Sequence, residues 1–266
     1  MRKMLFSLFF CVYLQPNFYT MKKIMFLTLA ALLFYSCSGA GTENVASDVN
    51  ATDSSDSSAL SVASDSKSEA AMRALGLVDI HDYDSMIAVQ MVYATPYNFM
   101  GRVLYHDVRK AFMLPELAEK VVAANRELKK IRPDANLIIY DAARPLAIQQ
   151  EMWNMVKGTE MDYYVSNPEK RNGLHNYGAA VDVTIMDCTG NPLPMGSEYD
   201  YFGVEANTDQ EETLLKNGRI TIREYENRQL LRRVMTDQGL LTIKSEWWHF
   251  NLVTADVARE KYKILE

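Results

Sequence analysis

The amino-acid sequence predicts a single α+β domain in which helices flank an antiparallel or mixed central sheet. Apolar residues recur at helical spacing in three segments, whereas three short runs are rich in β-branched or aromatic residues. These predicted helices and strands do not alternate regularly, as they would in a doubly wound parallel sheet. The 266 residues are 48% hydrophobic and 23% charged, which suits a folded domain rather than a fibrous or wholly disordered chain.

The predicted helices are bounded by residues that start or stop a helix. The first begins at Leu114, where Pro115 suits the first turn, and it ends before Pro133. In chain order, the predicted elements are a helix at 114–131, a strand at 137–140, a helix at 145–156, a strand at 179–185, a helix at 224–236 and a strand at 247–252. Residues 187–220 contain several glycines and prolines, which indicates a long functional loop.

Residues 1–37 resemble a secretory signal. They contain basic but no acidic residues, and an apolar run at 24–35 follows two lysines. Met21 is an alternative start of translation. The small residues around Cys37 resemble the end of a bacterial lipoprotein signal, which predicts a lipid on the Cys37 sulfur. The alternative is an ordinary cleaved signal with an incidental cysteine.

Residues 38–71 are expected to form a flexible tether ahead of a folded domain at 72–266. The stretch is rich in serine, alanine and acidic residues and contains no aromatic residue, so it has little apolar surface to bury. Signal, lipid and tether together predict a bacterial envelope protein whose domain lies outside the cytoplasm, on the periplasmic side. Its contact with the membrane is expected to be the lipid anchor only.

Charge and cysteine content narrow the possible partners. The net charge of −6, from 28 basic and 34 acidic residues, argues against nucleic acid as a partner. No obligate protein partner is predicted. The 3 cysteines are too few and too scattered for a disulfide framework, and Cys188 is expected to be a small buried residue near the site. A metal site must therefore draw on carboxylates and the 4 histidines.

The first segment that indicates chemistry is His175-Asn-Tyr-Gly-Ala-Ala-Val-Asp182. His175 is predicted on a turn before Gly178, and Asp182 lies in the strand that follows. An imidazole and a carboxylate brought together in this way can bind a borderline metal such as zinc. The alternative is a turn histidine and a strand-end aspartate with structural roles only.

The second segment is Ser245-Glu246-Trp-Trp-His249. His249 can supply a third metal ligand, and Glu246 can accept a proton from water, as general bases do in zinc hydrolases. Residues three apart on a straight strand point to opposite faces, so Glu246 is expected at a bend or strand entrance. The alternative makes His249 a buried structural imidazole beside two core tryptophans.

The third segment is Asp141-Ala-Ala-Arg144-Pro145, at the junction of a predicted strand and helix. An arginine at the end of an element can hold a carboxylate or the oxyanion of a tetrahedral intermediate. A structural salt bridge to Asp141, or a surface position, is the alternative.

Together these three motifs resemble those of the zinc D-alanyl-D-alanine dipeptidase family (VanX-like), relatives of the zinc D,D-carboxypeptidases. The resemblance extends over roughly residues 78–253. Its further matching segments are Val92 to Gly101, Pro194 to Phe202 and Asn227 to Arg232. Gly173 is a departure, because relatives usually have serine two residues before the first zinc histidine.

The resemblance implies a zinc D,D-peptidase type of fold and one Zn²⁺ per chain, with roles for seven residues. The implied metal ligands are His175, Asp182 and His249. Glu246 is implied as the catalytic base and Arg144 as the group that stabilises developing negative charge. Asp200 is implied to bind the ammonium of a dipeptide substrate, helped by Tyr93; the alternative is that Asp200 caps a turn.

The implied activity is zinc-dependent hydrolysis of the D-Ala-D-Ala dipeptide in bacterial cell-wall metabolism. One alternative is a D,D-carboxypeptidase that trims peptidoglycan stem peptides. Another is a non-catalytic, lipid-anchored cell-wall-binding module with a structural metal. Glu246 argues against the binding module, because a structural metal site needs no base.

Overall fold

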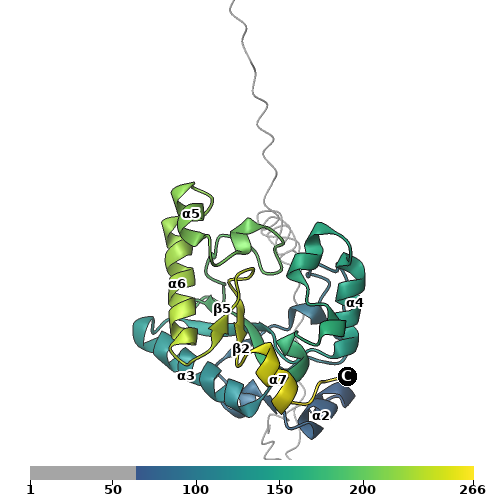
Figure 1. Cartoon of the computed structure of the whole chain (residues 1–266). Coiled ribbons are helices and arrows are strands. Elements are labelled where there is room, and N and C mark those ends of the chain that lie inside the picture. The colour runs from purple at the N-terminus through teal and green to yellow at the C-terminus, as the bar shows by residue number, and fades with distance from the viewer. Residues whose placement is uncertain (1–63) are drawn as a thin grey trace, which may run out of the picture. The chain divides into compact units, whose positions relative to one another are not determined.

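The computed structural model describes residues 64–266 (Figure 1). Its helices are α2 (Lys67–Ala74), α3 (Pro115–Ile131), α4 (Leu146–Val156), α5 (Glu211–Lys216), α6 (Ile222–Thr236) and α7 (Ala255–Lys261). Its strands are β1 (Val78–Asp79), β2 (Ala88–Val89), β3 (Phe112–Met113), β4 (Asn136–Asp141), β5 (Ala180–Met186), β6 (Leu241–Thr242) and β7 (His249–Asn251). Short 3₁₀ helices are η1 (Ile80–Asp82), η2 (Val92–Ala94), η3 (Glu160–Tyr164), η4 (Pro168–Lys170), η5 (Leu174–Tyr177) and η6 (Val204–Ala206).

The central sheet has five strands in the order β2-β4-β5-β7-β6. β2 is parallel to β4, and the other neighbouring strands are antiparallel, so the sheet is mixed. β1 and β3 form a separate two-stranded antiparallel sheet. The predicted α+β class with an antiparallel or mixed sheet is therefore confirmed.

The core lies between the sheet and its helices. α3 and α6 pack against each other, and they also contact β4 and β5 respectively (Figure 1). Six of the seven residues of β5 are buried, because the strand is covered on both faces. Asn125 of α3 accepts a hydrogen bond from the Leu137 N–H at 2.9 Å, which joins this helix to the start of β4.

Periodicity predicted the principal elements well. α3, α4 and α6 lie within two residues of their expected starts, and β4 and β5 within one. α6 begins at Ile222 because Thr221 and Glu224 form a capping box. The last predicted strand is shorter than expected: β7 begins at His249, and the two tryptophans before it lie on bends.

Two expectations about irregular segments were wrong. The predicted loop at 187–220 contains η6 and α5, and acidic residues at 211 and 212 lie in the first turn of α5, where they favour a helix. The predicted tether boundary at residue 71 is too late, because α2 begins at Lys67. Ser66 caps this helix, and the buried Glu69 carboxylate accepts hydrogen bonds from the Arg109 and Lys110 N–H groups.

The strands that meet at the centre of the sheet bring distant residues together. Asp182 of β5 is the direct cross-strand partner of His249 in β7. The register between β4 and β5 shifts between Ile139 and Asp141, and this irregularity places Asp141 opposite Asp182. The acidic groups of β4 and β5 and the imidazole of β7 thus lie close together at the centre of the sheet.

The predicted signal, the Cys37 lipid site and most of the tether lie outside the described residues. Among residues 64–266, no helix combines the length and the apolar character needed to span a bilayer.

Candidate active site

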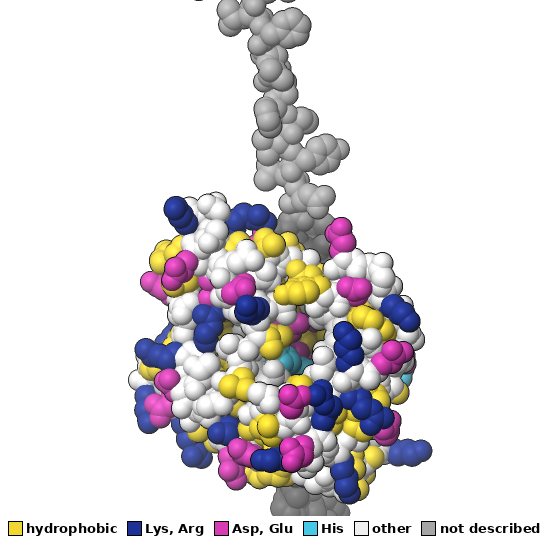
Figure 2. All heavy atoms as spheres, in the orientation of Figure 1, with side chains coloured by type: hydrophobic (Ala, Val, Ile, Leu, Met, Phe, Trp, Pro, Cys, Tyr) yellow, Lys and Arg dark blue, Asp and Glu magenta, His cyan; other side chains and the backbone are white. Residues whose placement is uncertain are grey.

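A pocket opens at the centre of the face drawn in Figure 2, where histidine and acidic side chains are visible in a hollow. It is lined by residues from η2, the β4–α4 turn, η5, β5, the 194–205 segment and the approach to β7. The lining includes all seven residues to which the sequence assigns a catalytic, metal-binding or substrate-binding role. The fold therefore brings together residues that are up to 156 positions apart, from Tyr93 to His249.

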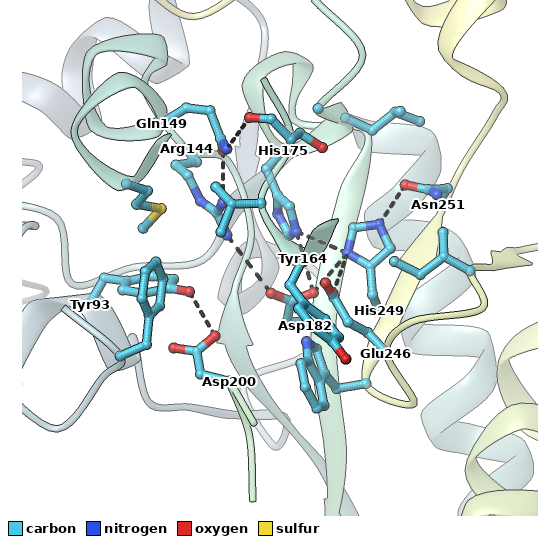
Figure 3. Close-up of a pocket in the computed structure, with 18 of the residues that line it drawn as sticks. Tyr93, Arg144, Gln149, Tyr164, His175, Asp182, Asp200, Glu246, His249 and Asn251 are labelled. Atoms are coloured by element: carbon cyan, nitrogen blue, oxygen red, sulfur yellow. Dashed lines mark hydrogen bonds and ion pairs between the residues drawn. The ribbon is translucent and has the colours of Figure 1, made fainter. Parts of the chain in front are cut away.

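His175, Asp182 and His249 form the metal cluster, and all three side chains are buried (Figure 3). His175 Nε2 lies 3.2 Å from His249 Nδ1 and 3.3 Å from Asp182 Oδ1. His249 Nδ1 lies 3.0 Å from the same oxygen. Three corners of a tetrahedron around zinc, with ligand distances near 2.0–2.1 Å, are about 3.3 Å apart. The three ligand atoms therefore fit one Zn²⁺.

Hydrogen bonds at the outer edge of the metal cluster orient its ligand atoms. His175 Nδ1–H donates to the Ala142 carbonyl at 2.6 Å, which leaves the lone pair on Nε2. His249 Nε2–H donates to Asn251 Oδ1 at 2.8 Å, which leaves the lone pair on Nδ1. Tyr199 donates its hydroxyl to Asp182 Oδ2 at 2.9 Å. Both lone pairs and the free carboxylate oxygen thus converge, as a metal cation requires.

Local backbone structure explains how the cluster forms. η5 carries His175 and ends at Gly178, whose φ of +64° reverses the chain into β5. A Cβ at Gly178 would lie 2.7 Å from Leu77 Cδ2, so glycine also permits the close approach of these segments. Burial opposes ionisation of Asp182, but His175 and His249 hold the pKa of its carboxyl well below the usual range. Asp182 is therefore an anion.

Glu246 lies in an irregular segment just before β7. This agrees with the expectation from its spacing, because residues three apart on a straight strand would point to opposite faces. Glu246 Oε2 is 3.9 Å from His249 Nδ1, so the carboxylate reaches the edge of the metal cluster. Burial raises the pKa of the Glu246 carboxyl, and His249 partly offsets that increase. A dication at the cluster would lower this pKa again, which would bring Glu246 into the range that suits a general base near neutral pH.

Arg144 lies in the turn between β4 and α4. Its Nε and Nη2 donate to Asp141 Oδ2 at 2.9 and 2.6 Å, and its Nη1 donates to Gln149 Oε1 at 2.8 Å. The predicted alternative of a structural ion pair with Asp141 is therefore present. Arg144 also lines the pocket, and its Nη2 is 3.9 Å from Asp182 Oδ2. Although burial opposes the charge, Asp141 keeps the pKa of Arg144 well above its usual value, so the guanidinium is a fixed cation beside the cluster.

Asp200 and Tyr93 form the other end of the pocket, here called the Asp200 end (Figure 3). Tyr93 donates its hydroxyl to Asp200 Oδ1 at 2.8 Å. Asp200 Oδ2 is buried and has no hydrogen-bond partner among the described residues. Asp200 therefore does not cap a turn through its side chain, although its own backbone is left-handed, with φ of +60°. Burial raises the pKa of its carboxyl to about 7, opposed by the hydrogen bond from Tyr93.

Gly173, the departure from the resembling family, lies close to two polar side chains. A Cβ at Gly173 would lie 3.0 Å from Asn176 Oδ1 and 3.4 Å from Ser166 Cβ. Ser166 also lines the pocket, so a hydroxyl-bearing side chain from a different segment lies beside the glycine. No sequence motif indicated Ser166, because it is close to residue 173 only in the folded chain.

Some of the remaining polar residues support the site although the sequence did not indicate them, and others lie outside the pocket. Asn251, Tyr199 and Gln149 are contributors, since each donates or accepts a hydrogen bond to an expected site residue. Their signal in the sequence is weak because single Asn, Tyr and Gln residues form no motif. Outside the pocket, His81 and His106 are exposed. Cys188 is also exposed rather than buried, because it lies in the turn that follows β5.

Comparison with known proteins adds independent evidence. A peptidase M15 family model described as D-ala-D-ala dipeptidase matches residues 73–265. A D-alanyl-D-alanine dipeptidase of Escherichia coli is 30% identical over 179 residues, covering 67% of this chain and 86% of that protein. Proteins of the same name from Enterococcus faecium and Synechocystis are 31% identical over 180 residues and 28% over 157 residues. These matches cover 60% and 48% of this chain, and 83% and 64% of those relatives.

Proposed function

The chain belongs to the M15 D-Ala-D-Ala dipeptidase family, and from that premise we propose that it hydrolyses the free dipeptide D-Ala-D-Ala. One observation carries the proposal: the metal cluster lies in one pocket with the Asp200 carboxylate, whose Oδ2 has no partner among the described residues, and Glu246 and Arg144 lie beside the cluster. A peptidase needs the metal and the base, whereas recognition of a free amine needs the buried carboxylate. We assign the substrate to bacterial cell-wall metabolism, since D-Ala-D-Ala is a cell-wall component.

In this proposal His175 Nε2, Asp182 Oδ1 and His249 Nδ1 hold one Zn²⁺. A bound Zn²⁺ supplies Lewis-acid polarisation of the peptide carbonyl and makes water more acidic. Glu246 accepts a proton from the attacking water and later delivers it to the departing amine. Arg144 stabilises the negative charge that develops on the carbonyl oxygen, while its contacts with Asp141 and Gln149 keep the guanidinium in place.

Substrate length is assigned to the Asp200 end. An ammonium group can donate to Asp200 Oδ2, the oxygen without a partner, and this ion pair satisfies a buried carboxylate. A longer peptide has an amide in place of that ammonium, so it would leave the Asp200 charge unpaired. The buried position of the carboxylate makes this mismatch costly. The proposal therefore favours a dipeptidase over a carboxypeptidase.

The direct test is incubation of the zinc-loaded protein with D-Ala-D-Ala and, separately, with a stem pentapeptide that ends in D-Ala-D-Ala. Release of D-Ala is the readout. We expect cleavage of the dipeptide and little cleavage of the pentapeptide. Efficient pentapeptide cleavage would instead identify a D,D-carboxypeptidase, and metal binding without cleavage of either peptide would identify a binding module.

We further propose that Cys37 carries a lipid and that the domain acts on the periplasmic side of the envelope. The supporting features are the basic and apolar segments before Cys37 and the small residues around it. Replacement of Cys37 by serine tests this location. We expect Cys37→Ser to move the protein into the soluble envelope fraction, whereas unchanged membrane retention would contradict the lipid anchor.

A further inference from the structure

α6 holds both ends of the segment that carries Asp200. Asn227 Nδ2 donates to the Pro194 carbonyl at 2.8 Å. Next to it, Arg228 donates from Nε to the Met195 carbonyl and from Nη2 to the Glu205 carbonyl. The residues from 194 to 205 therefore form a loop whose two ends are joined through one helix. This loop is called the 194–205 loop below.

Arg228 also connects the 194–205 loop with the segment that carries Glu246. Its side chain is fully buried, and its guanidinium carbon lies 5.9 Å from the centre of the Trp247 ring. Trp247 Nε1–H in turn donates to Ser197 Oγ, inside the loop, at 2.9 Å. Glu211 lies 3.6 Å from Arg228 Nη1 and supplies the opposite charge. Such a buried cation is held in one orientation by its partners.

Asp200 is carried by the 194–205 loop rather than by a helix or strand. It lies outside the helices and strands of the described region, and its φ of +60° is uncommon for a residue other than glycine. A backbone conformation of this kind persists only where surrounding contacts impose it. The contacts that surround this loop include those of Asn227 and Arg228 at its ends.

We propose that Asn227 and Arg228 are positioning residues that set the substrate specificity of the pocket by holding Asp200 toward the substrate ammonium. The inference rests on the proposed function, because it assigns Asp200 the recognition of a free amine. Neither residue lines the pocket, so neither touches the substrate. Both contact the 194–205 loop directly, whereas the metal ligands come from η5, β5 and β7; the loop itself reaches the metal cluster through the Tyr199 hydroxyl, which donates to Asp182 Oδ2. Their loss should therefore weaken binding of the free amine and leave the hydrolytic step intact.

Asn227→Ala is the principal test variant, since it removes one hydrogen bond and leaves the buried Arg228–Glu211 pair in place. Arg228→Lys is a second variant that keeps the charge but loses the fork that spans the loop ends. Arg232→Gln is the matched control on the same helix, because Arg232 hydrogen-bonds Glu211 at 2.6 Å rather than a carbonyl of the 194–205 loop. All are measured as full-length, zinc-loaded proteins.

We expect Asn227→Ala to raise KM for D-Ala-D-Ala about fivefold, the equivalent of one ordinary hydrogen bond, with kcat changed less than about twofold. Hydrolysis of N-acetyl-D-Ala-D-Ala, which has no ammonium, should be unchanged. In an Asp200→Asn background the Asn227→Ala substitution should have no further effect on KM. The Arg232→Gln control should leave KM for both substrates unchanged.

A KM increase of the same size in the Asp200→Asn background, or for the acetylated dipeptide, would overturn the inference. If Asp200→Asn alone leaves KM for the dipeptide unchanged, the amine-binding role has failed, and amide hydrogen exchange then decides the positioning role. Faster exchange across residues 196–204 in Asn227→Ala, but not in Arg232→Gln, would support positioning. Unchanged exchange there would contradict it.

Discussion

The metal cluster and the Asp200 end both contain buried carboxylates, but different parts of the fold hold them. The metal cluster lies on the two neighbouring strands β5 and β7 and on η5, and the oriented atoms of its ligands have partners. Asp200 lies in a loop, with a left-handed backbone and one buried oxygen that has no partner among residues 64–266. In the proposed function, the residues assigned to the chemistry therefore lie on or beside the sheet, which gives them rigid geometry, whereas the residue assigned to specificity lies on a supported loop.

The pKa values of the two carboxylates express the same difference. The histidines stabilise the anionic form of Asp182, which is ready to bind a cation permanently. Burial instead penalises the anionic form of Asp200, because no cation among residues 64–266 forms an ion pair with it and Arg144 offsets the penalty only in part. A substrate ammonium would supply that missing cation each time a dipeptide binds.

The largest expected effect is on catalysis at the metal cluster, and it distinguishes the proposed base, Glu246, from the metal ligands. Glu246→Gln should lower kcat by about 10²–10⁴-fold, the usual contribution of a general base, and should retain zinc. His249→Ala should lose both zinc and hydrolysis, because a metal ligand is removed. Zinc content by atomic absorption and D-Ala release are the measurements. A Glu246→Gln protein with full activity and bound zinc would rule out this residue as the base.

A smaller effect concerns the support of the metal cluster. Asn251→Leu removes the oxygen that accepts the His249 Nε2–H, so His249 loses the partner that keeps its lone pair on Nδ1. Zinc affinity should fall about 10–100-fold, as measured by competition with a chelator. The matched variant Asn251→Asp retains an acceptor and should bind zinc at least as tightly as the unmodified protein. Equal affinity in the leucine variant would show that the cluster does not depend on this contact.

The smallest expected effect is on stability and arises at the Asp200 end. Folding raises the pKa of the Asp200 carboxyl from 3.8 to about 7, so the folded state binds this proton more tightly than the unfolded chain. The resulting destabilisation is absent below the unfolded pKa and complete above pH 7. Asp200→Asn should therefore raise the unfolding free energy at pH 8 by on the order of 2 kcal/mol.

Urea unfolding of the metal-free protein at pH 8 and pH 5 measures this effect without the pH dependence of zinc binding. The gain from Asp200→Asn should be smaller at pH 5, because much of the wild-type carboxyl is protonated there in the folded state. An equal gain at both pH values would mean that the substitution acts through packing rather than through the buried charge.

The sequence indicated the residues of the metal cluster more completely than the residues that hydrogen-bond to them. His175, Asp182, Glu246 and His249 belong to short motifs, and the apolar periodicity of β5 and α6 placed most of their framework. Asn251 and Tyr199 were not indicated, because their roles arise only when β5, β7 and the 194–205 loop pack together. Local sequence carries no signal for such contacts.

Short elements account for most of the remaining differences between the predicted and the observed fold. β1, β2 and β3 have 2 residues each, too few for any periodicity to show. α2 lies in a serine- and alanine-rich stretch whose composition resembles a tether, and its position depends on Glu69 bonding the backbone of residues 109 and 110. That contact is 40 residues away in sequence and invisible to local patterns.

The most direct test of the division between chemistry and specificity is the ratio of kcat/KM for D-Ala-D-Ala to that for N-acetyl-D-Ala-D-Ala. It is measured with the zinc-loaded wild-type protein and with Asp200→Asn. We predict that the wild type favours the free dipeptide by about 100-fold, the scale of one buried charge pair, and that Asp200→Asn loses most of this preference while retaining zinc. An undiminished preference in Asp200→Asn would contradict the account, because the free amine would then be recognised elsewhere.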